Sequence, residues 1–170
     1  MMVHPISKSA VTIAIVGFVI VAAYAVLGAL QILVLNPMAA APDLTLAEIQ
    51  AAVAEAGESL PPFPVVVFVS LGLLLAALVM LYAITAPGPR PGVVAVMMLV
   101  IVALGAPAYF AASFPAGMAL ADTFMISGGD HSRWSALLFL TSATALVSAI
   151  ALAIVLALRA RRAAPAARDH

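Results

Sequence analysis

The feature that most constrains this chain is its last apolar run, Ala136 to Leu158, which holds no charged residue. About 23 residues in a helix, rising about 1.5 Å each, can cross a hydrocarbon core of about 30 Å with some tilt. The run ends in a basic cluster of Arg159, Arg161 and Arg162. Because basic residues are enriched on the cytoplasmic side of spanning helices, this pattern predicts a membrane span with a cytoplasmic C-terminal end.

Composition extends this prediction to the whole chain. The 170 residues are 66% hydrophobic and only 8% charged, and the mean hydropathy is +1.24. A water-soluble domain carries roughly a quarter charged residues and could not hide so much apolar surface. We therefore expect residues 1–170 to form a single membrane domain.

Three further apolar runs complete the expected architecture. The four spans are predicted at about 11–35, 65–84, 93–112 and 134–158. The first is too long for the core of a signal peptide, which has about 7–15 residues. Asn36-Pro37 is expected to end the first span, and Pro107 to kink or thin the outer end of the third. The dense prolines and glycines of residues 86–92 predict a tight turn between spans two and three. The fold class is therefore an all-α integral membrane protein with four transmembrane helices in an antiparallel bundle.

A short amphipathic helix is predicted at about 46–56, between the first two spans. Thr45 and Glu48 have the spacing of a capping box, and Gly57 is a plausible stop. Apolar residues recur at helical spacing at Leu46, Ile49, Val53 and Leu60. We expect this helix either to lie on the outer membrane surface or to cap the bundle, and its acidic face offers a docking surface as an alternative role.

The positive charges predict the topology. One side collects Lys8, Arg90, Arg159, Arg161, Arg162 and Arg168, and the other has Arg133 alone. Both termini, including a basic tail at 159–170, are therefore expected in the cytoplasm, and both larger loops outside the plasma membrane.

Several functional classes are excluded by what the sequence lacks. The net charge is zero and no basic run precedes the C-terminus, so we expect no nucleic-acid partner. There is no cysteine, which removes disulfides and thiolate metal sites. None of the predicted spans contains an ionisable residue, and the histidines are His4, His131 and His170. This argues against a proton-coupled carrier and against haem bound inside the bilayer, and we expect no cofactor.

Small residues recur every four positions along the last span, at Thr141, Ala145, Ala149, Ala153 and Ala157. Such a stripe lets two helix backbones approach closely. It fits packing within the chain's own bundle or an interface with another subunit, and a span so rich in Ala, Ser and Thr also produces stripes by chance.

The best enzymatic candidates lie in the second outer loop, at Asp122, Asp130 and His131. A carboxylate beside an imidazole can orient a general base or contribute to a zinc site. However, neither H-E-x-x-H nor G-x-S-x-G is present. The simpler interpretation is that Asp130 or Ser132 caps the fourth helix and His131 is solvated, so we expect no catalytic or metal-binding residues.

The layout resembles that of small, uncharacterised four-span membrane proteins of high-GC Gram-positive bacteria. The likeness rests on the Asn36-Pro37 pair after the first span and on the outer segment Leu44-Thr45-Leu46-Ala47-Glu48-Ile49. It implies a plasma-membrane location and no particular activity.

Three functions remain open. The first is a non-catalytic accessory, assembly or stabilising subunit of a larger membrane complex, with the lipid bilayer and other subunits, or further copies of the chain, as its partners. The second is a homo-oligomeric channel or transporter for small solutes, lined by residues such as Gln31, Ser70, Tyr82 and Ser148. The third is a membrane enzyme with a site on the outer face.

Overall fold

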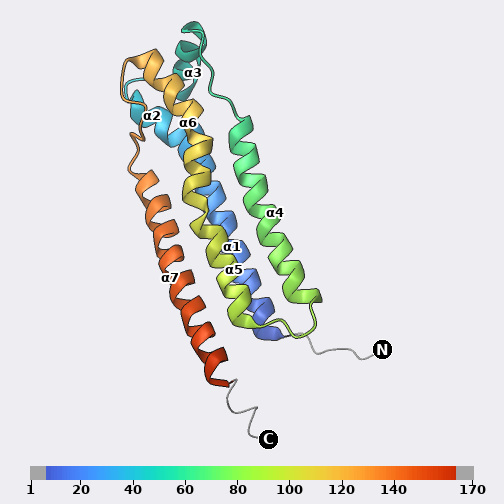
Figure 1. The fold of residues 1–170 in the computed structure, drawn as a ribbon. Helices are drawn as coiled ribbons and strands as arrows, with labels where there is room; N and C mark the ends of the chain where they lie inside the picture. The colour runs from blue at the N-terminus through green and yellow to red at the C-terminus, as the bar shows by residue number, and fades with distance from the viewer. Residues whose placement is uncertain (1–6, 164–170) are drawn as a thin grey trace, which may run out of the picture.

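The computed structural model describes residues 7–163, which contain helices and no β-strand. His4, Arg168 and His170, and with them the end of the predicted basic tail, lie outside the described residues. Within residues 7–163, four helical stretches are long and apolar enough to cross a membrane: Lys8–Ala40, Phe63–Thr85, Pro91–Phe124 and Trp134–Arg162. Figure 1 shows them gathered into an elongated bundle. The prediction of an all-helical chain with four apolar helices is confirmed.

The predicted basic anchors lie together at one end of the bundle. The start of α1 (Lys8–Leu30), the turn before α5 (Pro91–Ala103) and the end of α7 (Trp134–Ala163) are all found there (Figure 1). These segments carry Lys8, Arg90, Arg159, Arg161 and Arg162. The loop with Arg133 lies at the opposite end, beside α2 (Asn36–Ala40) and α3 (Leu46–Glu55).

The first apolar helix does not end at Asn36-Pro37, so this prediction was wrong. After α1 the chain forms one π-helical segment, η1 (Gln31–Leu35), and then continues as α2 to Ala40. Proline has no N–H to donate, and its ring crowds the carbonyl four residues earlier. The wider π turn, in which the Asn36 N–H donates to the Gln31 carbonyl, lets the helix continue past Pro37.

The short helix α3 begins with the predicted capping box. The Thr45 hydroxyl accepts from the Glu48 N–H at 3.3 Å, and the Glu48 carboxylate accepts from the Thr45 N–H at 2.8 Å. Gly57, with a φ of 80°, follows the end of the helix. The apolar face of α3 buries Ile49 and Val53 against α6 (Gly105–Phe124). Of the two expected positions, α3 therefore takes the one that caps the bundle.

The third apolar stretch is broken into α5 and α6 at Leu104, three residues before Pro107. Because Pro107 lacks an N–H, the carbonyl of Ala103 has no intrahelical partner, and the expected kink appears at this point. Residues 113–124, which follow the end of the predicted third span, instead continue α6 to Phe124. This extension is covered by α3, which packs on Ala119 and Leu120. Because α3 covers this extension, α6 can continue beyond the end of the apolar run.

Helix α1 lies at the centre of the packing. It contacts α4 (Phe63–Thr85) on one side and α5 on the other, while α7 packs on α5 along its length. Many large apolar side chains outside these contacts point away from the bundle, including Val19, Leu74 and Val147. An outer surface of this kind is suited to lipid rather than water.

We expect Thr45→Ala to weaken the start of α3 by about 1 kcal/mol, because the substitution leaves a backbone N–H without its acceptor. Amide hydrogen exchange corrected for intrinsic rates should show about fivefold lower protection across residues 47–55. Glu48→Gln is the matched control, since glutamine can also accept from the Thr45 N–H. Unchanged protection in Thr45→Ala would contradict a stabilising role for the capping box.

The pH dependence of α3 has a defined sign. Hydrogen bonds from the backbone and then the side chain of Thr45 lower the pKa of Glu48. Because the folded-state pKa lies below the unfolded value, the carboxylate stabilises α3 above the unfolded pKa. That contribution is lost as the pH falls through the folded pKa. The amide hydrogen-exchange protection of α3, corrected for intrinsic rates, should fall over this acidic range in the native chain. It should stay level over the same range in Glu48→Gln.

Candidate functional site

The residues singled out as enzymatic candidates do not form one site. Asp122 lies on the last turn of α6, whereas Asp130 and His131 lie in the loop before α7. The Asp130 carboxylate accepts a hydrogen bond from the Tyr109 hydroxyl at 2.8 Å. The His131 Nε2 lies 3.0 Å from the Ser127 carbonyl oxygen. Asp130 and His131 therefore have separate partners, and between residues 7 and 163 no acid is bonded to an imidazole as a general base would require.

No cluster of three or more His, Cys, Asp or Glu side chains that could hold a metal is found between residues 7 and 163. Ser132, rather than Asp130, makes the contact at the start of α7, because its hydroxyl accepts from the Trp134 N–H at 3.4 Å. This loop thus serves to connect and cap helices. In the part of the chain that the structure describes, the side chains of Asp122, Asp130 and His131 are not bonded to one another.

Two buried amide side chains hold this loop on the bundle. The Asn36 Oδ1 accepts from the N–H of His131 at 2.7 Å and from that of Ser132 at 3.4 Å. Gln31, which is fully buried, donates from Nε2 to the Ser132 carbonyl at 3.5 Å. Both amides come from the π turn and its continuation, and so depend on the helix that passes through Asn36-Pro37. The sequence showed these polar residues but not the loop they contact.

A second polar group, in the middle of the bundle, joins α1, α5 and α7. The Ser142 hydroxyl donates to the Val102 carbonyl at 2.9 Å, and the Tyr24 hydroxyl lies 3.0 Å from the Ser142 Oγ. Because the Ser142 proton is used by Val102, the Ser142 oxygen accepts from the Tyr24 hydroxyl, for which the Leu138 carbonyl at 3.4 Å is a second acceptor. The ring of Tyr24 fits against Gly105, where a Cβ would lie only 2.6 Å from its Cε1. The kink between α5 and α6 thus receives the tyrosine ring.

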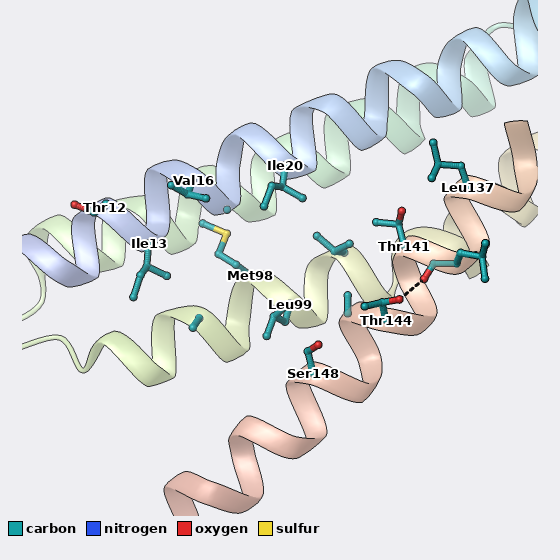
Figure 2. Close-up of a pocket in the computed structure, with 15 residues that line it drawn as sticks. Thr12, Ile13, Val16, Ile20, Met98, Leu99, Leu137, Thr141, Thr144 and Ser148 are labelled. Atoms are coloured by element: carbon teal, nitrogen blue, oxygen red, sulfur yellow. Dashed lines mark hydrogen bonds between the residues drawn. The ribbon is translucent and has the colours of Figure 1, made fainter.

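A groove with a volume of about 690 Å³ lies between α1, α5 and α7. In this lateral groove α1 and α7 stand apart over α5 (Figure 2). The floor is apolar and includes Met98 and Leu99 of α5. Hydroxyl side chains border it on both sides: Thr12 on α1, and Thr141, Thr144 and Ser148 on α7.

The groove hydroxyls fall into two groups. Thr12 donates to the Lys8 carbonyl at 3.0 Å and Thr144 donates to the Leu140 carbonyl at 2.8 Å, each within its own helix. Thr141 and Ser148 instead direct their oxygens toward the groove (Figure 2). These two hydroxyls can bind a group that enters the groove.

The small-residue stripe on α7 is divided by the packing. Ala145 and Ala149 are buried, 5% and 4% exposed, where α7 packs on α5. Thr141 borders the lateral groove, while Ala153 and Ala157 are exposed. The middle of the stripe therefore fits packing within the chain, and its two ends remain available to a neighbour.

The residues expected to line a channel lie apart within one chain. Gln31 is fully buried, Ser70 and Tyr82 are exposed on α4, and Ser148 borders the lateral groove. A single copy does not gather them around one passage.

Comparison of the chain with protein-family models, with curated proteins and with solved structures found no match.

The bond between Tyr24 and Ser142 leads to a direct stability test. Tyr24→Phe keeps the ring at Gly105 and removes the hydroxyl, so it should lower the free energy of unfolding by about 0.5–1.5 kcal/mol. Tyr82→Phe removes an exposed hydroxyl from α4 and should change the free energy of unfolding by much less. Thermal unfolding in a mild detergent measures both variants. Equal melting temperatures for the two would contradict the assigned bond.

Proposed function

We propose that this chain is a four-span plasma-membrane protein with an antiparallel bundle and cytoplasmic termini. We further propose that it serves as a non-catalytic assembly subunit that receives a membrane helix of a partner protein in the lateral groove. The gathering of the basic anchors at one end of the bundle supports the topology. The side chains that border the groove support a membrane helix as the partner.

The observation that carries the proposal is the position of hydroxyl groups in an apolar groove. Ser148 lies about 14 residues into α7, or roughly 21 Å along the helix from Trp134. In a bilayer with a hydrocarbon core of about 30 Å, this places Ser148 well inside the apolar layer. Acyl chains offer no hydrogen-bonding group at that depth, whereas a neighbouring helix offers backbone carbonyls and polar side chains. The groove therefore favours a helix over a lipid tail.

The size of the bordering side chains supports close helix packing. Ala95 on α5 and Ala145 on α7 line the groove together with the hydroxyl residues. Small residues let a second backbone approach, and helix association in lipid depends on such close packing because lipid tails are as apolar as the helices. An interhelical hydrogen bond adds only about 0.6 kcal/mol. Packing would therefore supply most of the affinity and the hydroxyls would set the register.

Filling the groove tests this function. Ser148→Trp places a large ring in the groove, and Ser70→Trp makes the same change on the exposed side of α4. Native mass spectrometry of gently extracted complexes should show a stoichiometric partner with the native chain and with Ser70→Trp. We expect at least tenfold less of that partner with Ser148→Trp, because the ring occupies the space of the partner helix.

Cross-linking supplies a second readout for the same groove. The chain contains no cysteine, so single cysteines at positions 141 and 148 need no background substitutions. A short photoactivatable maleimide at either position should cross-link to the partner identified by mass spectrometry, and one at position 70 should not. Retention of the partner by Ser148→Trp, or equal cross-linking from position 70, would contradict the proposal.

The proposed topology is tested by labelling intact cells with a membrane-impermeant maleimide. Glu58→Cys lies in the loop beside α3 and should react without permeabilisation. Pro87→Cys lies in the turn between α4 and α5 and should react only after the membrane is opened. The reverse pattern would show that the termini lie outside.

A further inference from the structure

The two ends of the bundle differ in charge. The basic end, where α1 and α5 begin and α7 ends, carries the exposed side chains of Lys8, Arg90, Arg159, Arg161 and Arg162 (Figure 1). The acidic residues between positions 7 and 163 all belong to segments at the other end: Asp43, Glu48, Glu55, Glu58, Asp122 and Asp130. None of these carboxylates is therefore placed to neutralise the basic end.

Packing brings two of the arginines, Arg90 and Arg159, to neighbouring helix ends. Helix α5 has no side chain at Gly92, where a Cβ would lie only 2.8 Å from the Leu156 Cδ2, so α5 and α7 approach closely there. Arg90 precedes Gly92 by two residues. Arg159 follows Leu156 by three residues. Both steps lead toward the basic end, so the two arginines lie at one corner, between the start of α5 and the end of α7.

Helical spacing places Arg159, and not Arg161, on the side of α7 that faces α5. The buried and half-buried residues of that side recur three or four residues apart, at positions 142, 145, 149, 152 and 156. Position 159 continues this series. Arg161 instead follows the exposed residues Ile154 and Ala157 at helical spacing, so it lies on the side of α7 that faces away from α5.

Two guanidinium groups at one corner repel each other, and an anion bound between them relieves this repulsion. Arginine is always charged, and its N–H groups match phosphate oxygens in pairs. Arg159 directly follows Leu158, the last residue of the apolar run. In the proposed membrane topology, the corner therefore lies at the level of the cytoplasmic lipid headgroups, where anionic phospholipids give the surface a negative potential.

Apolar side chains next to the corner can receive the acyl chains of such a lipid. Val93 and Met97 follow Arg90 at helical spacing on α5. On α7, Val155 precedes Arg159 by four residues. All three apolar side chains are exposed, by 38%, 37% and 41% respectively. A lipid held at the corner by its phosphate can therefore also contact α5 and α7 through its acyl chains.

We propose that Arg90 and Arg159 bind the headgroup phosphate of one anionic phospholipid at this corner. The site goes beyond the proposed assembly function. It rests on the proposed membrane topology, but it does not need a partner helix in the lateral groove.

Native mass spectrometry of the full chain in detergent tests the site. The protein is titrated with phosphatidylglycerol or with phosphatidylcholine of the same acyl chains, because only the first lipid carries a net negative charge. We expect the first phosphatidylglycerol to bind about tenfold more tightly than the first phosphatidylcholine. Equal affinities for the two lipids would overturn the proposal.

Three exposed arginines, each changed to glutamine, separate a defined site from a general attraction. Arg90→Gln and Arg159→Gln should each weaken binding of the first phosphatidylglycerol about fivefold, the factor expected for one basic residue near an anionic surface. Arg161→Gln is the matched control, because it removes the same charge from the other side of the same helix, and its effect should be much smaller. Equal losses in Arg159→Gln and Arg161→Gln would overturn the assigned site.

Two further results separate this proposal from its alternatives. An excess of inorganic phosphate should leave phosphatidylglycerol bound, and its displacement by phosphate would overturn the assignment to a lipid. The labelling of Pro87→Cys in intact cells tests the topology independently. Equal binding of the two lipids together with the expected labelling would overturn the lipid site alone, whereas reversed labelling would overturn the topology on which the site rests.

Discussion

The hydrogen bonds from Tyr24 to Ser142 and from Ser142 to the Val102 carbonyl are the interaction on which the middle of the bundle depends. Between apolar helices in lipid there is no hydrophobic force to order them, so close contacts and polar bonds decide which surfaces meet. These two bonds connect three helices at one level. They are possible because Pro107 interrupts the helix at Leu104 and Gly105 leaves space for the tyrosine ring. A single kink therefore sets the positions of α1, α5 and α7 together.

The same attachment creates the lateral groove. Ser142, Ala145 and Ala149 turn one face of α7 toward α5, and their neighbours Thr141 and Ser148 then border the space in front of α1 (Figure 2). Because α7 packs mainly on α5, the groove between α7 and α1 stays open on its outer side. This surface of small and hydroxyl side chains is the basis for proposing that the protein binds a partner helix.

The opposite end of the bundle is built differently, from amides and a capping helix. Pro37 would normally end a helix, but the π turn carries the chain past it and places the amides of Gln31 and Asn36 under the following loop. Helix α3 covers the extension of α6 with Ile49 and Val53. Of the groups that suggested catalysis, Asp130 ties the loop to α6 by accepting from the Tyr109 hydroxyl, whereas the His131 imidazole contacts the Ser127 carbonyl within the loop itself.

Local chemistry was enough to predict much of the fold. Uninterrupted apolar runs predicted the four long helices, the Thr45–Glu48 pair predicted the start of α3, and the prolines and glycines of residues 86–92 predicted a turn. These features depend on neighbours in the sequence, so the sequence alone reveals them. The passage of the helix through Pro37, the extension of α6 to Phe124 and the division of the α7 stripe could not be predicted in this way. Each depends on a partner distant in the chain: the loop that takes up the Asn36 amide, the helix α3 that covers α6, and the α5 surface that buries Ala145 and Ala149. Periodicity shows which residues share a helix face, but only the packed bundle determines which helix, loop or open groove that face meets.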